Sequence, residues 1–144
     1  MKRLNLLLHV TSSAGWWGGV AAFLALAVAG VAGDSHAACR AMAVIGWGAI
    51  VPLAVLSSAT GLVQSLGGAW GVLRHWWVVF KIVVTLPCSL LLLLHLKALD
   101  ACTARTAGQM TVDAALALIV LMVPLGLSVY KPRGLTPWTA PRGP

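Results

Sequence analysis

The chain has 144 residues, of which 60% are hydrophobic and only 9% are charged. Soluble domains carry about 25% charged residues, so this composition excludes an ordinary water-soluble domain and predicts a single membrane-embedded domain. The net charge of +7 does not indicate nucleic-acid binding, because the basic residues are dispersed at the ends of apolar segments instead of being gathered on one face.

Four apolar segments are long enough to cross the hydrocarbon core of a bilayer, which requires roughly 20 residues. In chain order they cover residues 4–31, 41–66, 72–99 and 110–130. The first resembles a secretory signal, but it is longer than a signal-peptide core and is predicted to be retained. Because the connections are short, neighbouring helices should be antiparallel. Residues 1–130 are therefore predicted to form an all-α, up-down bundle of four transmembrane helices.

Basic residues are unevenly distributed between the two ends of this predicted bundle. One end carries Lys2, Arg3, Arg74, Lys131, Arg133 and Arg142. At the other end three basic residues are offset by three acidic ones, namely Arg40, Lys97 and Arg105 against Asp34, Asp100 and Asp113. The positive-inside rule then predicts a multi-pass protein of the cell membrane with both termini in the cytoplasm. The basic, Pro- and Gly-rich residues 131–144 are predicted to be a flexible cytoplasmic tail.

Two ionisable residues lie deeper than the interface inside predicted spans on the cytoplasmic side. Lys81 lies in the third span, where insertion of a Lys costs about 2.5–3.5 kcal/mol. Two interpretations stay open, since its ammonium group either snorkels to the interface or faces the bundle interior as a counter-charge or ligand. His9 lies at a similar depth in the first span. The second span adds a polar stripe, whose three- and four-residue spacing indicates one helix face, at Ser57, Thr60, Gly61 and Gln64.

Aromatic residues lie near these polar groups. Trp16 and Trp17 are too deep in the first span to belong to an interfacial aromatic belt. The sequence therefore predicts an intramembrane polar pocket that contains a cation, an imidazole, a carboxamide and flat aromatic walls. Such a pocket suits an anionic, planar, apolar ligand, and its predicted residues are His9, Lys81, Trp16, Trp17, Gln64 and Thr60.

The outer end of the bundle leaves several interpretations open. His36 and His95, together with Cys39 and Cys102, suit a copper or zinc site. His36 with His95 at the outer end, and His9 with His75 at the inner end, would suit two bis-His haems. Cys39 and Cys102 are predicted to be unpaired thiols, with a disulfide as the alternative.

The three acidic residues of the chain are all predicted to lie at the outer end. Asp100 and Asp113 are expected to cap or flank helices. Because no acidic residue is predicted at mid-membrane, the sequence disfavours a carboxylate-based proton or cation transporter.

Three short motifs resemble a known group of small membrane proteins. They are His9 followed by Trp16-Trp17-Gly18-Gly19, then Thr60-Gly61-Leu62, and then Arg74-His75-Trp76-Trp77 with Lys81. The group includes actinobacterial-type membrane proteins of unassigned function and, more distantly, the copper-resistance D (CopD) family and the HemJ-type protoporphyrinogen oxidases. The resemblance covers roughly residues 4–98. Its HemJ-type branch implies b-type haem binding and porphyrinogen oxidation through His9 and Lys81.

Three functions follow as expectations. The first is haem b or porphyrin binding in a redox role, with His9 as a ligand of the haem iron and Lys81 as the second ligand or the partner of a propionate. The second is a non-enzymatic accessory or scaffold subunit in the bilayer, with membrane-protein partners or as a homo-oligomer. The third is copper handling, by analogy with the CopD relatives. Whether the chain is an enzyme stays open.

Overall fold

The computed structural model describes residues 2–67, 76–98 and 103–130, and it is all-helical. The elements are α1 (Lys2–Ala32), α2 (Ser35–Ile45), a π-helical segment η1 (Gly46–Ile50), α3 (Val51–Gly67), α4 (Trp76–Ala98) and α5 (Ala104–Tyr130). Since α2, η1 and α3 follow one another without a break, the described residues form four long helical segments. All four are long and apolar enough to cross a membrane, which confirms the predicted fold class.

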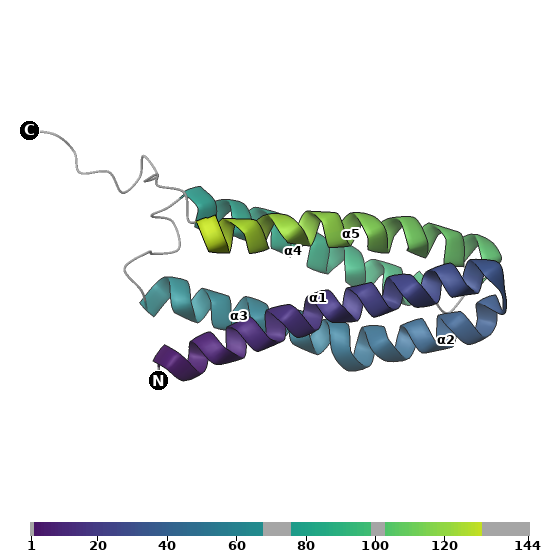
Figure 1. Ribbon diagram of the computed structural model, residues 1–144, viewed down its shortest axis with the longest axis horizontal. Helices are drawn as coiled ribbons and strands as arrows, with labels where there is room; N and C mark the ends of the chain where they lie inside the picture. Colours follow the sequence, from purple (N-terminus) through teal and green to yellow (C-terminus); the bar gives the residue numbers. More distant parts are fainter. Residues whose placement is uncertain (1, 68–75, 99–102, 131–144) are drawn as a thin grey trace, which may run out of the picture.

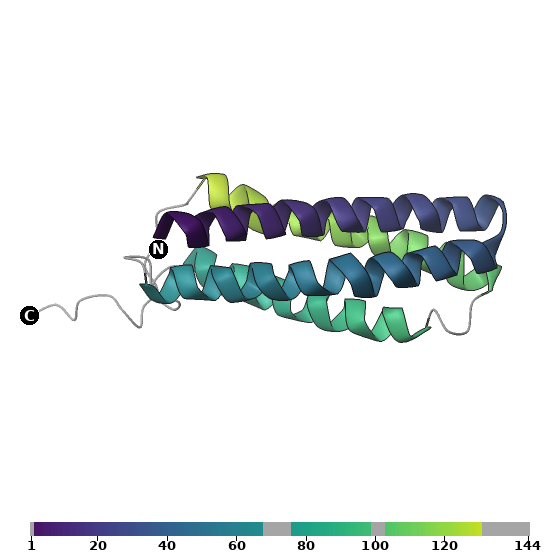
Figure 2. The same cartoon turned by 90° about the horizontal axis from the view of Figure 1, so that it is seen from below.

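The four segments alternate in direction. α1 begins and α5 ends at one end of the molecule, which we call the terminal end (Figure 1). The α1–α2 connection and the start of α5 lie at the opposite end, which we call the turn end. α1 packs along α2, α3 and α5, whereas α4 packs mainly against α5 and approaches α3 at few positions (Figure 2). The bundle is therefore tightest around α1 and looser around α4.

Two helices begin earlier than the apolar pattern predicts, because polar residues cap their first turns. The Asp34 carboxylate accepts hydrogen bonds from the backbone N–H of His36 at 2.9 Å and Ala37 at 3.1 Å, so α2 begins at Ser35. The bond from Ala37 is the largest cause that lowers the pKa of Asp34. Thr103 and Thr106 cap α5 reciprocally, each backbone N–H donating to the other hydroxyl at 3.3 and 3.2 Å.

The π-helical segment lies just before Pro52. The Val51 N–H donates to the Gly46 carbonyl, five residues back, instead of four as in an α-helix. Pro52 has no N–H and its ring crowds the preceding turn, and a widened turn next to it relieves this crowding. Gly46 lies directly against the Leu96 side chain of α4, so the lack of a side chain at this position lets α4 approach.

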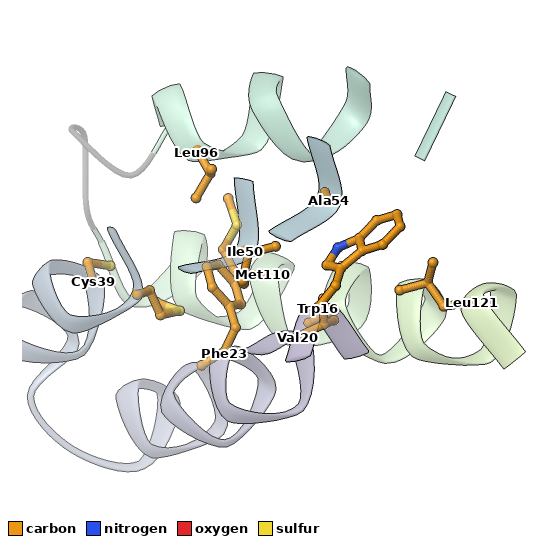
Figure 3. Packing of buried hydrophobic residues seen from close by; sticks show 12 residues of the cluster. Trp16, Val20, Phe23, Cys39, Ile50, Ala54, Leu96, Met110 and Leu121 are labelled. Carbon is orange, nitrogen blue, oxygen red and sulfur yellow. The ribbon is translucent and has the colours of Figure 1, made fainter. Parts of the chain in front are cut away.

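Apolar side chains fill the interior and also cover the outside. The buried cluster includes Trp16, Phe23, Ile50 and Leu96 (Figure 3). Large apolar side chains are also exposed along every segment, among them Val44, Leu91 and Ile119. Such a surface is matched by lipid acyl chains and not by water. The predicted loop with Arg74 and His75, as well as Asp100, Cys102 and the tail 131–144, lies outside the described residues.

Candidate functional site

A row of hydrogen-bonded polar side chains joins α1 to α3 in the half of the bundle nearer the terminal end. Gln64 Nε2 donates to the Asn5 carbonyl at 3.3 Å, and Asn5 Nδ2 donates to the Thr60 carbonyl at 3.2 Å. Deeper in the bundle, the hydroxyls of Ser13 and Ser57 are 2.6 Å apart. We call this row the α1–α3 seam, and its members are Asn5, His9, Ser13, Ser57, Thr60 and Gln64.

His9 lies at the centre of the seam, and its contacts determine its tautomer. Nδ1 is 3.0 Å from the Ser57 carbonyl oxygen and 3.2 Å from Thr60 Oγ1. A carbonyl only accepts hydrogen bonds, so Nδ1 must carry the proton. The Thr60 hydroxyl donates to the Leu56 carbonyl at 2.7 Å, so it also acts as an acceptor towards His9. In the neutral imidazole the free lone pair is therefore on Nε2, to which no described residue is hydrogen-bonded.

Gly61 sets the position of the His9 ring. A Cβ atom at residue 61 would lie 3.0 Å from Cε1, 3.4 Å from Nδ1 and 3.9 Å from Nε2 of His9. The imidazole thus lies against bare backbone, and the missing side chain leaves it room beside α3. Two hydrogen bonds and this close contact hold the ring in one orientation.

Lys81 lies on α4, and its side chain is partly buried and interacts electrostatically with the His9 imidazole. The structure brings together three of the predicted site residues on the seam, namely His9, Thr60 and Gln64. Asn5 belongs to the same network, but the sequence pattern did not single it out because one Asn near a helix start is common.

The two tryptophans do not share a face. Trp16 is buried, with 7% of its surface exposed, and packs in the apolar cluster with Val20 and Ala54 (Figure 3). Trp17 is 41% exposed on the outside of α1, so it does not form a wall of an interior site with Trp16.

The indole Nε1 of Trp16 is buried and has no hydrogen-bond partner among the described residues. A buried donor without a partner costs about 1–3 kcal/mol, and it requires an explanation.

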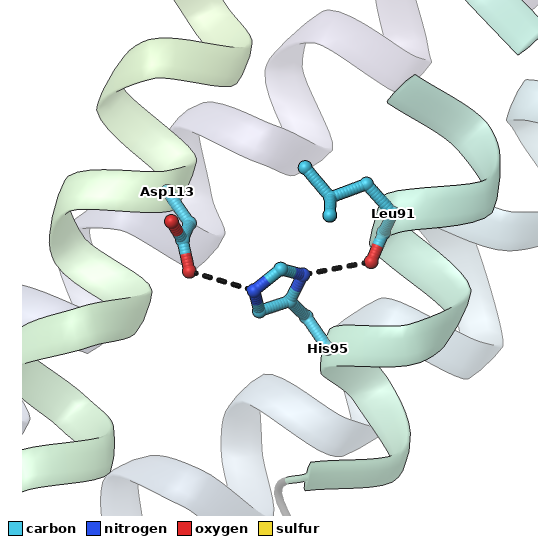
Figure 4. A network of polar contacts seen from close by, with 3 residues as sticks. All are labelled: Leu91, His95 and Asp113. Carbon is cyan, nitrogen blue, oxygen red and sulfur yellow. Dashed lines mark hydrogen bonds and ion pairs between the residues drawn. The ribbon is translucent and has the colours of Figure 1, made fainter. Parts of the chain in front are cut away.

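A second polar contact joins α4 to α5 in the half nearer the turn end. His95 Nε2 lies 2.9 Å from Asp113 Oδ2, and His95 Nδ1 lies 2.8 Å from the Leu91 carbonyl (Figure 4). The prediction that Asp113 caps or flanks a helix was wrong. Because α5 begins at Ala104, Asp113 lies well inside the helix and within its apolar span. The sequence placed Asp113 at the outer end of the bundle, whereas in the structure it is preceded by more than two turns of α5.

The described residues that were predicted for an outer metal site, His36, Cys39 and His95, do not form a metal-binding group. His36 is exposed in the first turn of α2, His95 contacts Asp113, and Cys39 is disulfide-bonded. Cys39 is therefore not the unpaired thiol that the sequence favoured, and its sulfur is not a free thiolate ligand. Within residues 2–67, 76–98 and 103–130, no group of three His, Cys, Asp or Glu side chains is placed to hold a metal ion. Cys88 in α4 is a free thiol.

The chain matches no protein-family model, no curated protein and no solved structure. The resemblance of its short motifs to the CopD and HemJ-type families therefore stays an expectation.

Proposed function

We propose that the chain is a membrane-embedded protein that binds haem b or a related metalloporphyrin in a redox role, with His9 Nε2 as a ligand of the iron. The observation that carries this proposal is the tautomer of His9. Histidines that bind metals usually donate their other ring N–H to a carbonyl or carboxylate, which fixes the ring and makes the free nitrogen more basic. His9 shows this arrangement, since Nδ1–H bonds to the Ser57 carbonyl 3.0 Å away.

Two further groups fit such a ligand. The Lys81 ammonium, which lies within electrostatic range of His9, supplies positive charge for a propionate in surroundings where an unpaired carboxylate is costly. The unpartnered indole N–H of Trp16 lies about two turns further along α1, on nearly the same helix face as His9. It is a donor that an acceptor group on a bound molecule would satisfy.

The chain itself contributes orientation and charge. Thr60 and the Ser57 carbonyl orient the imidazole, and Gly61 leaves room for it. Bound haem iron would supply one-electron chemistry, with a potential that depends on its axial ligands and on burial. The seam would therefore be the scaffold of the site, and Lys81 its electrostatic partner.

The proposal includes a location and an orientation. An even number of membrane spans brings both termini to the same side, and the basic residues of the sequence cluster at that end. By the positive-inside rule the terminal end is cytoplasmic, in the cell membrane. The seam then lies in the cytoplasmic half of the bilayer.

Absorption spectroscopy tests the proposal. The full chain, purified in detergent and then titrated with haemin, is expected to develop a Soret band that saturates at one haem per chain. His9→Ala should abolish the saturable band, and Lys81→Ala should weaken binding without abolishing it. His36→Ala is the matched control, because His36 is exposed in the first turn of α2. An unchanged Soret titration with His9→Ala would contradict the proposal.

One observation favours a second candidate, a non-enzymatic accessory subunit. The hydrogen bonds of His9 already link α1 to α3 without any ligand, so the residue has a structural role in its own right. This function predicts no Soret band in the wild-type chain and normal assembly of a His9→Gln variant with its partner complex. Haem titration and co-purification therefore separate the two candidates.

A further inference from the structure

The contact between His95 and Asp113 has no part in the proposed haem site. It lies on α4 and α5, whereas the seam lies on α1 and α3. The two side chains are 24% and 30% exposed, and both residues lie within segments apolar enough to cross a membrane. Ionisable residues inside a membrane span are rare, and when they occur they commonly mark proton or ion sites.

Hydrogen bonding inside α4 fixes the role of each His95 nitrogen. Nδ1 lies 2.8 Å from the Leu91 carbonyl oxygen, one turn earlier in the helix. Because a carbonyl only accepts, Nδ1 carries a proton and donates it there. Nε2 is therefore the nitrogen whose protonation can vary, and it is the one that faces Asp113 (Figure 4).

The carboxylate oxygen next to Nε2 needs a compensating charge. Asp113 Oδ2 is buried, and no hydrogen bond reaches it from the described residues. Its 2.9 Å contact with Nε2 is therefore electrostatic and not a well-directed hydrogen bond. A carboxylate left uncompensated in apolar surroundings costs several kcal/mol. One proton, held on Nε2 or on Oδ2, makes the pair neutral as a unit.

The described helices packed around this pair place no other buried titratable group next to it. α1 beyond His9 and the whole of α3 contain no titratable residue. On α4, Lys81 lies about four turns and Cys88 about two turns before His95. Cys39 of α2 is disulfide-bonded. The remaining described titratable residues of α2, α4 and α5 are exposed, namely His36, Arg40, Lys97, Arg105 and Tyr130.

We propose that His95 and Asp113 form a membrane-embedded binding site for one exchangeable proton, shared between α4 and α5. The site is close to the turn end, since α4 ends at Ala98, and it exchanges its proton with solvent at that end. It gives the bundle a proton donor and acceptor within the apolar spans of α4 and α5. The site does not depend on haem binding at His9.

Nuclear magnetic resonance of the full chain in lipid nanodiscs tests this site, with ¹⁵N-labelled His and ¹³C-labelled Asp. The chain has only four His and three Asp residues, so single substitutions assign the signals. At neutral pH we expect the wild-type pair to hold one proton beyond that on Nδ1, seen as a doubly protonated His95 or as a protonated Asp113. In Asp113→Asn, His95 should be protonated on Nδ1 alone.

Controls separate this result from a general loss of structure. Asp34→Asn changes an exposed cap residue and should leave the His95 signal unchanged, and the His9 signal reports whether Asp113→Asn keeps its fold. If Asp113→Asn does not fold, His95→Gln provides the same test through the Asp113 signal. A wild-type pair with neutral His95 and ionised Asp113 would overturn the proposal. A doubly protonated His95 that persists in Asp113→Asn would also overturn it, because the proton would not be shared.

Discussion

The bundle contains two polar regions that differ in how their groups are satisfied. The α1–α3 seam consists of polar side chains that bond mostly to backbone carbonyls of the facing helix, as Asn5 does to Thr60 and His9 does to Ser57. The α4–α5 region consists of two ionisable side chains, His95 and Asp113, in contact with each other. The helices that carry the two regions also differ in how closely they pack. α1 packs closely along α3, whereas α4 packs less closely against α5 and α3.

The two regions therefore illustrate two different roles that polar side chains have inside a membrane. Neutral hydrogen bonds of the seam hold a ring in one orientation, and each is worth only about 0.6 kcal/mol on average in membrane proteins. An ionisable pair is sensitive to the loss of either partner, because the remaining charge stays in apolar surroundings. The seam is therefore suited to positioning a ligand, and the pair is suited to holding a proton.

The largest effect is expected when one member of the ionisable pair is removed. His95→Leu leaves Asp113 without its partner and should lower the free energy of unfolding in mixed micelles by about 2–3 kcal/mol. The double variant His95→Leu/Asp113→Leu should recover most of this loss, because two apolar side chains replace a charged pair. If the double variant loses as much unfolding free energy as the two single variants together, the two residues are not coupled.

A smaller effect is expected where the seam is crowded. In Gly61→Ala the new Cβ would lie 3.0 Å from His9 Cε1, and the ring has little freedom to move because Nδ1 is hydrogen-bonded. We expect a loss of about 1–2 kcal/mol, together with weaker haem binding. The matched control is Gly18→Ala on α1, where a Cβ would meet no atom within 4 Å. Equal stability of the two variants would mean that His9 does not lie against Gly61.

Removing one neutral hydrogen bond of the seam should have a modest effect. Ser57→Ala deletes the contact with the Ser13 hydroxyl but keeps the Ser57 carbonyl that accepts from His9. The expected loss of unfolding free energy is about 0.6 kcal/mol, with an unchanged haem titration. Ser58→Ala, at an exposed neighbouring position, serves as the control. A large loss of haem binding in Ser57→Ala would show that the seam positions His9 differently.

The smallest effect is expected outside both regions, at the cap of α2. Hydrogen bonds from Ala37 and His36 lower the pKa of Asp34 in the folded chain. The cap therefore stabilises the fold above the unfolded-state pKa, and this contribution is lost as the pH falls through the folded-state pKa. The melting temperature of Asp34→Ala should lie slightly below that of the wild type at neutral pH, with a difference that shrinks in acid. A difference that grows in acid would contradict this assignment.

Much of the fold could be predicted from the sequence, because apolar length alone specifies membrane spans. The spacing of Ser57, Thr60 and Gln64 predicted one polar face, and in the structure that face meets α1. Helix starts could not be predicted from hydropathy, since capping by Asp34 and Thr103 extends α2 and α5 beyond their apolar cores. This extension explains the error at Asp113, which was assigned to a helix end because the helix was expected to start later.

The details of the candidate site were only partly predictable. Depth along a helix predicted that His9 and Lys81 share one half of the bundle. It does not predict in which direction a side chain points around the helix axis. Trp17 therefore lies on the outer surface although it is adjacent to buried Trp16. The pairing of His95 with Asp113 depends on the relative position of α4 and α5, which no pattern within either helix contains.

The proposed haem site requires the seam to hold His9 with Nδ1 protonated and Nε2 free to bind a metal. The ¹⁵N spectrum of His9 in the haem-free full chain, assigned with His9→Gln, measures this directly. We expect the signature of a neutral imidazole whose proton is on Nδ1, with a change at Nε2 when haemin is added. A proton found on Nε2, with Nδ1 bare, would contradict the hydrogen bond to Ser57 and the proposed haem site with it.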